Sequence, residues 1–259
     1  MGSTMIVVSL LGGLGNQLFQ WAYGQALISR GYEVNFNRNS LVEYTHREYS
    51  LGEYFDLPNC PVIDNFMTEK CMKFDPAFLA PPENTTVVGY FQTEKYFENL
   101  ATQIRYGFNF HWMKKRLTGV AAEISKEIYQ SNSVFLHVRR QDYVGLQHFH
   151  GMPTIEYYYE ALKEIQSKHH DTKAFLFTDD YWWCAERFPD NVRIVTGTSK
   201  YDDLRLMASC KHAILANSSF SWWSCWLGDN QLGRTVISPK RWFSADVENE
   251  IAPERWMKL

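Results

Sequence analysis

Apolar residues along the chain gather into short runs that alternate with longer amphipathic segments. A short apolar run bounded by polar or Gly/Pro residues is typical of a buried strand, whereas apolar residues recurring every three or four positions predict a helix. We therefore expect strands over residues 5–10, 32–37, 86–91, 133–138, 174–178, 192–195, 212–216 and 234–238. We expect helices over residues 16–30, 96–106, 112–130, 154–169, 181–188, 201–210 and 221–227. Residues 39–82 are rich in proline and are expected to be irregular.

The alternation of strands and helices predicts an α/β fold, in which parallel sheets are covered by helices on both faces. A chain of 259 residues suits one large domain or two lobes of about 100–150 residues each. We place the boundary near residue 108. This division gives a first lobe over residues 1–108 and a second lobe over residues 109–259.

Ligands of such sheets bind beyond the carboxyl ends of the strands, so the residues after each expected strand carry the chemistry. The first strand is followed by Gly-Gly-Leu-Gly-Asn-Gln, residues 12–17. This loop resembles the dinucleotide fingerprint G-x-G-x-x-G, but Leu18 stands where the third glycine would be. Glycines let the backbone approach a ligand closely, and Asn16 offers a donor and an acceptor to sugar hydroxyls or phosphate. The loop thus favours a nucleotide-sugar over a dinucleotide.

The segment His-Val-Arg-Arg-Gln-Asp, residues 137–142, follows the first strand of the second lobe. Arg139 and Arg140 are adjacent, and a guanidinium pairs with phosphate through two parallel hydrogen bonds. The alternative is a solvated arginine pair with Asp142 as a surface partner. His137 shares a strand face with Arg139, as either a ligand contact or a core histidine.

Phe-Thr-Asp-Asp, residues 177–180, could bind a metal, a base edge or a ribose through Asp179 and Asp180. The alternative is a helix N-cap at Thr178 or Asp179. The chain contains no D-x-D motif of the kind that holds a divalent cation in glycosyltransferases. A carboxylate here can instead accept hydrogen bonds from guanine.

Residues 217–228 place Ser218, Ser219 and Phe220 at an expected helix start. Helix N-termini present unpaired N–H groups that bind phosphate, although a serine cap on a core helix explains the same pattern. The three tryptophans of this segment are more typical of a core than of a ligand site.

Composition narrows the classes of function. The net charge of -3 and the absence of a nucleic-acid motif argue against a nucleic-acid partner. Five cysteines without a C-x-x-C pair argue for reduced thiols rather than disulfides or a zinc site, and hence for the cytoplasm. Neither a signal peptide nor an apolar run of about 20 residues is visible.

Together, the four clusters resemble the GDP-fucose-dependent fucosyltransferases, and in particular the bacterial α-1,2-fucosyltransferase family, glycosyltransferase family 11. The resemblance implies a GT-B-like fold of two Rossmann-type lobes with a nucleotide-sugar cleft between them. It implies an inverting enzyme that transfers L-fucose from GDP-β-L-fucose to the 2-hydroxyl of a terminal galactose, with no metal or other cofactor. The site residues carried over by matching motifs are Asn16, His137, Arg139, Arg140, Asp179, Ser218, Ser219 and Phe220.

In these roles, Arg139 and Arg140 would hold the diphosphate, and His137 and Asp179 would lie near guanine. Ser218, Ser219 and Phe220 would contact the nucleotide, and Asn16 would reach the donor from the other lobe.

The general base departs from the pattern of the related α-1,6-fucosyltransferases. Their glutamate beyond the motif aspartate corresponds to Gln147 in this chain. We therefore take Asp142 as the first candidate base, and count it with Arg139 as catalytic. The further candidates are His148, His150 and Glu156.

Two other functions fit parts of the pattern. One is another nucleotide-sugar transferase of the same fold, and the other is a non-catalytic carbohydrate-binding protein, which the nine tryptophans would allow. We expect a galactose-terminated oligosaccharide as acceptor. We expect the protein to act in the bacterial cytoplasm, and at the periphery of the inner membrane if the acceptor is lipid-linked.

Overall fold

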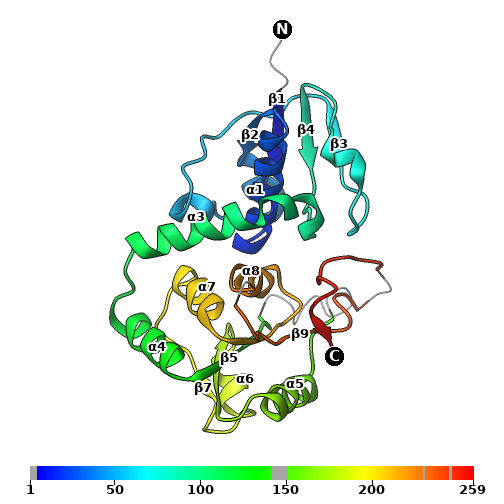
Figure 1. Cartoon of the computed structure of the whole chain (residues 1–259). Coiled ribbons are helices and arrows are strands. Elements are labelled where there is room, and N and C mark those ends of the chain that lie inside the picture. Colours follow the sequence, from blue (N-terminus) through cyan, green and yellow to red (C-terminus); the bar gives the residue numbers. More distant parts are fainter. Residues whose placement is uncertain (1–4, 142–150, 230, 245–246) are drawn as a thin grey trace. The chain divides into compact units, whose positions relative to one another are not determined.

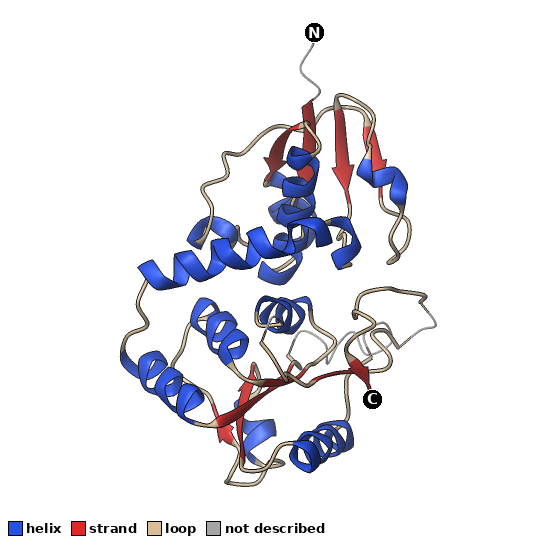
Figure 2. Cartoon of the chain, in the orientation of Figure 1, coloured by secondary structure: helices blue, strands red, loops and turns tan. Residues whose placement is uncertain are grey.

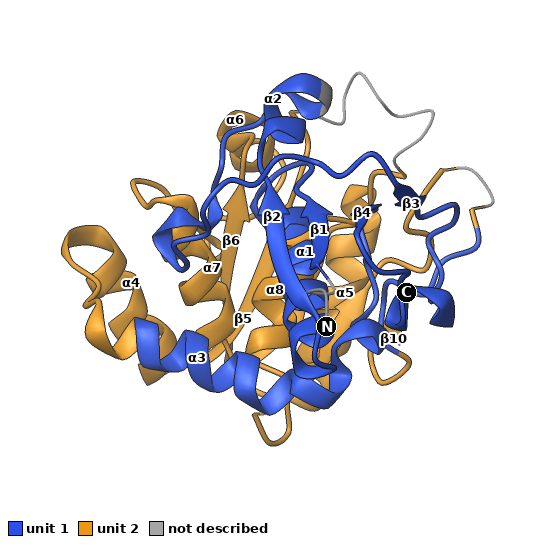
Figure 3. Ribbon diagram, turned by 90° about the horizontal axis from the view of Figure 1, so that it is seen from above, with its two compact units in different colours: residues 1–111, 248–253 blue, residues 112–247, 254–259 orange. Residues whose placement is uncertain are grey.

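The computed structural model describes residues 5–141, 151–229, 231–244 and 247–259, and it divides into two compact units (Figure 3). Unit 1 contains Met1–His111 and Glu248–Pro253, and unit 2 contains Trp112–Val247 and Glu254–Leu259. The division after His111 lies close to the boundary expected near residue 108. The short segment 248–253 joins unit 1 through a bridge between Met72 and Asn249.

Unit 1 is built on a four-stranded parallel sheet in the order β2-β1-β4-β3. Helix α1 connects the two strands β1 and β2 and is buried along most of its length (Figure 1). The strands are β1 (Met5–Ser9), β2 (Glu33–Asn37), β3 (Phe66–Thr68) and β4 (Thr85–Val88). The helices are α1 (Leu14–Ser29), α2 (Asn39–Thr45) and α3 (Ala101–Lys114), with single 3-10 turns at Leu51–Glu53, Pro76–Leu79, Glu94–Tyr96 and Glu98–Leu100.

Unit 2 is built on a six-stranded parallel sheet in the order β10-β9-β8-β5-β6-β7 (Figure 2). Its strands are β5 (Asn132–Val138), β6 (Thr172–Thr178), β7 (Arg193–Ile194), β8 (His212–Ile214), β9 (Val236–Ser238) and β10 (Met257–Lys258). Its helices are α4 (Gly119–Gln130), α5 (Ile155–Lys168), α6 (Tyr181–Ala185), α7 (Lys200–Ser209) and α8 (Ser219–Leu227).

The two faces of the unit 2 sheet are covered by different helices. Val134, Leu136 and Val138 of β5 are buried in one apolar cluster with residues of α5 and α6. Figure 1 shows α7 and α8 on the other face. Because side chains alternate along a strand, His137 belongs to the α8 face while its neighbour Val138 belongs to the α5 face.

Four expectations about secondary structure need correction. The helix expected over residues 96–106 is displaced, because 3-10 turns occupy Glu94–Tyr96 and Glu98–Leu100 and α3 runs over Ala101–Lys114. Residues 39–82 are not irregular throughout, since they contain α2 and the edge strand β3. The expected helix over residues 112–130 is wrong at its start, because α3 runs to Lys114 and α4 begins at Gly119, whose φ of +54° interrupts a right-handed helix. Strand β10 was not expected, because two residues leave too short an apolar pattern.

Within the described ranges, no helix combines the length and the apolarity that crossing a bilayer requires.

Candidate functional site

The arginine and aspartate pairs meet at the carboxyl edge of the unit 2 sheet. Strands β5 and β6 run parallel and in register, so that Val138 pairs with Thr178 at their ends. Arg139 and Arg140 leave β5 directly beside Asp179 and Asp180, which leave β6. Parallel strands end at the same edge of a sheet, so the register of β5 with β6 brings these four charged residues together.

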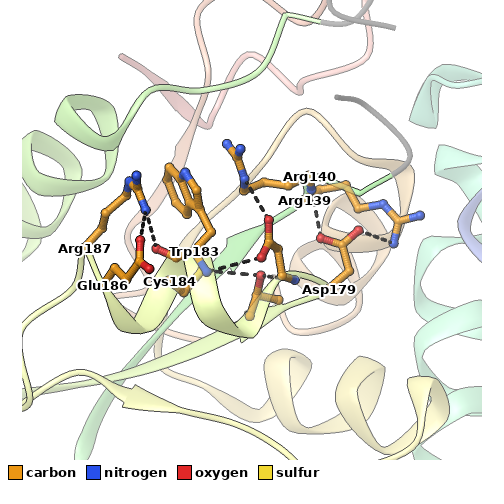
Figure 4. A network of polar contacts seen from close by, with 9 residues as sticks. Arg139, Arg140, Asp179, Trp183, Cys184, Glu186 and Arg187 are labelled. Carbon is orange, nitrogen blue, oxygen red and sulfur yellow. Dashed lines mark hydrogen bonds and ion pairs between the residues drawn. The ribbon is translucent and has the colours of Figure 1, made fainter. Parts of the chain in front are cut away.

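Each arginine is held by the aspartates (Figure 4). The Nη1 atom of Arg139 lies 3.1 Å from Oδ2 of Asp179. The backbone N–H of Arg140 donates to Oδ1 of Asp179 at 2.8 Å, and its Nε–H donates to Oδ2 of Asp180 at 3.2 Å. Both carboxylates therefore serve to orient the arginines. The predicted contact of Asp179 with guanine stays a prediction.

Asp180 also begins helix α6. Its Oδ1 accepts a hydrogen bond from the backbone N–H of Trp183 at 3.2 Å, and its own N–H donates to the Thr178 hydroxyl at 2.9 Å. The cap alternative is therefore right in kind, but the cap residue is Asp180 rather than Thr178 or Asp179. Helix α6 then places the Trp183 ring under Arg140, with the guanidinium carbon 4.1 Å from the ring centroid.

His137 lies on the face of β5 that α8 covers, opposite to the face that packs against α5 and α6. Its side chain is only 5% exposed, and its ring centroid lies 5.8 Å from that of Phe220. Burial, together with the charge of Arg139, lowers the pKa of His137 to about 3, so the imidazole is neutral at physiological pH. Its Nδ1 atom finds no hydrogen-bond partner among the described residues. A buried nitrogen left unpaired destabilises the fold, which favours a ligand contact over a purely structural role.

Helix α8 starts at the same edge, after β8. The Ser218 side chain caps it by accepting from the backbone N–H of Phe220 at 3.3 Å. Trp222, Trp223 and Trp226 are fully buried, which confirms that these tryptophans belong to the core. Ser218, Ser219 and Phe220 thus occupy the first turn of an anchored helix, and their contact with the nucleotide stays a prediction.

The glycine-rich loop lies in unit 1, at the carboxyl end of β1. Gly12 has a φ of +74°, and a Cβ added there would lie 2.3 Å from Nδ2 of Asn16. Glycine is therefore favoured by the positive φ of the loop itself, and a side chain at this position would also displace the Asn16 amide. Oδ1 of Asn16 accepts a hydrogen bond from Nε2 of Gln92 at 2.8 Å. Its predicted contact with the donor stays a prediction.

Two buried glutamines of α1 hold this loop in place. Nε2 of Gln17 donates to the carbonyls of Gly12 at 2.8 Å and Glu48 at 2.9 Å. Gln20 accepts from the N–H of Leu11 and donates to the carbonyl of Gly89. The Asn-Gln pair of the motif therefore divides its roles, with Gln17 structural and Asn16 at the edge of the sheet.

Of the candidate general bases, the structure describes only Glu156. Asp142, His148 and His150, with Gln147, lie outside the described residues. Glu156 is exposed in the first turn of α5, where hydrogen bonds from Thr154 and from its own backbone hold its pKa below the usual range. A lowered pKa makes a carboxylate a weaker base, which argues against Glu156 as the general base.

Over residues 5–141, 151–229, 231–244 and 247–259, no group of three or more His, Cys, Asp or Glu side chains could hold a metal ion.

Comparison with known proteins assigns the chain to a family. The sequence profile of "Glycosyl transferase family 11" matches residues 59–258, which include the Arg-Arg, Asp-Asp and α8 clusters. The chain belongs to glycosyltransferase family 11.

Two curated relatives of this family 11 protein come from Escherichia coli. An alpha-1,2-colitosyltransferase is 30% identical over 295 residues, covering 99% of this chain and 99% of the relative. The O-antigen biosynthesis glycosyltransferase WbnK is 32% identical over 137 residues, covering 50% of this chain and 45% of the relative. Both relatives are named as glycosyltransferases, in agreement with the family assignment.

Among solved structures, the family 11 chain is similar to the NodZ alpha-1,6-fucosyltransferase soaked with GDP-fucose. The TM-score is 0.50 at 16% identity, and the match covers 87% of this chain and 93% of that chain. At this identity the likeness concerns the fold. The predicted GT-B fold, with parallel sheets in both units, is confirmed.

Three contacts of the candidate residues were not expected from the sequence. In unit 2, Trp183 lies under Arg140 and the Tyr158 hydroxyl donates to the carbonyl of His137 at 2.9 Å. In unit 1, Gln92 donates to Asn16. Only Trp183 carried a local signal, because it follows the capping Asp180 by one helical turn on the side of the arginine pair. The other two contacts join segments that are distant in sequence.

Proposed function

We propose that this family 11 glycosyltransferase transfers L-fucose from GDP-β-L-fucose to the 2-hydroxyl of a terminal galactose, giving a Fuc-α-1,2-Gal linkage with inversion. The observation that carries the proposal is the arginine pair, which Asp179 and Asp180 hold at the carboxyl edge of the unit 2 sheet. A carbohydrate-binding protein without catalysis has no need for two guanidinium groups held at the edge of the sheet where a nucleotide would bind.

The leaving group explains what the arginines would do. As the galactose hydroxyl attacks C1 of fucose, the bond from C1 to the diphosphate oxygen breaks and negative charge grows on GDP. Preorganised donors aimed at developing charge are usually the largest catalytic contribution, and losing one typically lowers the rate about 10²–10³-fold. Arg139 and Arg140 would supply this stabilisation, so we propose that no metal or other cofactor is needed.

The nucleotide would be read at the α8 side. The neutral imidazole of His137 has an unpaired Nδ1 and lies beside Phe220, which suits contact with the guanine base. The first turn of α8, with Ser218 and Ser219, would contact the nucleotide's phosphate or ribose. Asp142 remains our first candidate for the base that removes the proton of the acceptor hydroxyl.

The donor sugar has a second candidate. One E. coli relative, whose match covers 99% of this chain, is named an alpha-1,2-colitosyltransferase. Colitose is fucose without its 3-hydroxyl. The same arginine pair would serve either donor, because the leaving group is the same diphosphate in both cases. The choice between them depends on contacts to the 3-hydroxyl, which a direct assay decides.

The test offers the purified protein GDP-fucose, GDP-colitose and UDP-sugars with a panel of galactosides, and determines the product linkage by NMR. The proposal expects an α-1,2-linked fucoside and thermal protection by GDP but not by UDP. Faster transfer of colitose would move the donor assignment to the second candidate. Binding of lactose without any binding of GDP would overturn the proposal in favour of a carbohydrate-binding protein.

The place of action follows from the acceptor. We propose that the enzyme works in the bacterial cytoplasm on a glycan carried by a membrane lipid, and so associates peripherally with the inner membrane. Cell fractionation checks this: the protein should partly sediment with membranes at low salt and be released at high salt.

A further inference from the structure

Trp183 of α6 lies between two guanidinium groups (Figure 4). The guanidinium carbon of Arg140 is 4.1 Å from its ring centroid, and that of Arg187 is 4.8 Å away. Arg187 is held in turn, because its Nη1 donates to the carbonyl of Trp183 at 3.2 Å and pairs with Glu186 at 3.0 Å. The indole is partly buried against the apolar cluster beneath β5. The indole is therefore packed on one side and flanked by two guanidinium groups.

Arg140 is restrained in three ways at once. Its backbone N–H donates to Asp179, its Nε–H donates to Asp180, and its planar group rests on the Trp183 ring. The same Asp180 carboxylate accepts from the backbone N–H of Trp183, so one side chain fixes both the helix start and the arginine. With Nε engaged, the two Nη groups remain; they make no hydrogen bond within the part of the chain that the structure describes.

We propose that Trp183 is a positioning residue for Arg140, holding its guanidinium in one orientation so that the Nη groups meet the diphosphate of the nucleotide-sugar. This inference rests on the proposed function. Arginine has a flexible side chain, and ordering it only when the ligand arrives would weaken binding. Stacking on the indole face, supported from the other side by Arg187, orders it beforehand.

Isothermal titration with GDP tests the proposal on the full chain. Trp183→Leu keeps an apolar side chain but removes the π face, and we expect about tenfold weaker GDP binding, from the usual strength of cation–π contacts. Trp183→Phe keeps a smaller aromatic face and should lose only about two- to threefold. The control is Tyr129→Leu, which removes an exposed aromatic ring of α4 near the amino end of β5 and should leave GDP binding unchanged.

A double-mutant cycle separates positioning from packing. If Trp183 acts through Arg140, adding Trp183→Leu to Arg140→Ala should change GDP affinity less than about twofold. A full additional tenfold loss in that background would overturn the inference. Thermal melting checks that each variant is folded, and if Trp183→Leu does not fold, Trp183→Phe alone and combined with Arg140→Ala carries the same comparison.

The outcomes also separate this inference from the proposed function. Wild-type protein that fails to bind GDP would overturn both. Wild-type protein that binds GDP, with Trp183→Leu and Trp183→Phe binding equally well, would leave the proposed function standing and overturn the positioning role.

Discussion

The Tyr158 hydroxyl of α5 donates a buried hydrogen bond of 2.9 Å to the backbone carbonyl of His137. This bond connects α5 to the end of β5, just before the arginine pair. Burial raises the pKa of the Tyr158 phenol, so it stays a donor at every physiological pH.

Tyr158→Phe removes only this donor. We expect a loss of about 1–2 kcal/mol in the free energy of unfolding, because one buried hydrogen bond to the His137 carbonyl is lost. We also expect kcat/KM to fall by about three- to tenfold, because a small shift of the strand end would misplace the arginines that it carries. Urea unfolding and steady-state kinetics measure the two effects. The matched control is Tyr23→Phe in unit 1, which loses a buried bond of 2.8 Å to the carbonyl of Phe78 and should lower stability with little effect on kcat/KM.

Arg139→Lys should be nearly as damaging as Arg139→Ala. Lysine retains the charge but loses the planar fork that pairs with phosphate and with Asp179. We expect either variant to lower kcat by about 10²-fold or more. Near-normal turnover of the lysine variant would show that a point charge suffices and would reject two-point recognition of the diphosphate.

Transfer activity should survive EDTA. If fixed arginines neutralise the departing diphosphate, a chelator has no catalytic ion to remove. Activity is measured with and without EDTA, and again after addition of Mn²⁺ or Mg²⁺. Abolition by the chelator and rescue by the metal would instead reassign Asp179 and Asp180 as metal ligands.

The free energy of unfolding should fall as the pH drops from about 6.5 towards 4. Burial, with further contributions from His169, Arg234 and Lys211, lowers the pKa of His212 to about 4, and that of His137 is lowered to about 3. The unfolded chain then binds protons that the folded chain rejects, so stability is complete above the unfolded pKa of about 6.5 and is lost below it. Urea unfolding at pH 7.5 and pH 5 measures the difference.

Asp203 opposes this trend and provides the control. Burial raises the pKa of its carboxyl to about 6, so its ionisation destabilises the fold as the pH rises through that value. Asp203→Asn should therefore make stability rise more steeply with pH and should stabilise the protein at pH 7.5. A stability profile that is flat from pH 5 to 7.5 in both proteins would contradict this account of the buried groups.

Asp142 lies outside the described residues, and kinetics decide its role. If it is the base, Asp142→Asn should depress kcat, by about 10²–10⁴-fold at most, while GDP affinity stays near the wild-type value. If it only orients Arg140, GDP binding should weaken as well. Measurement of both quantities on the same protein separates the two, and a large loss of GDP affinity would move the search for the base to His148, His150 and Glu156.

The sequence by itself determined the α/β class, the parallel sheets and the edge at which the site lies. Each rests on a local pattern. Apolar periodicity predicts strands and helices within a short window, and the polar residues after β5, β6 and β8 mark the carboxyl ends of strands. The motif residues Arg139 and Arg140 could be found for the same reason.

Only the tertiary structure decided what those residues touch. The two aspartates after β6 orient the arginines, because the register of β5 with β6 places the two strand ends side by side. No local sequence pattern encodes the register between strands that lie about forty residues apart. Gln92 meets Asn16, and Tyr158 meets His137, across long stretches of chain. Such contacts depend on how helices pack on the sheet, which is fixed by the whole core rather than by any one segment.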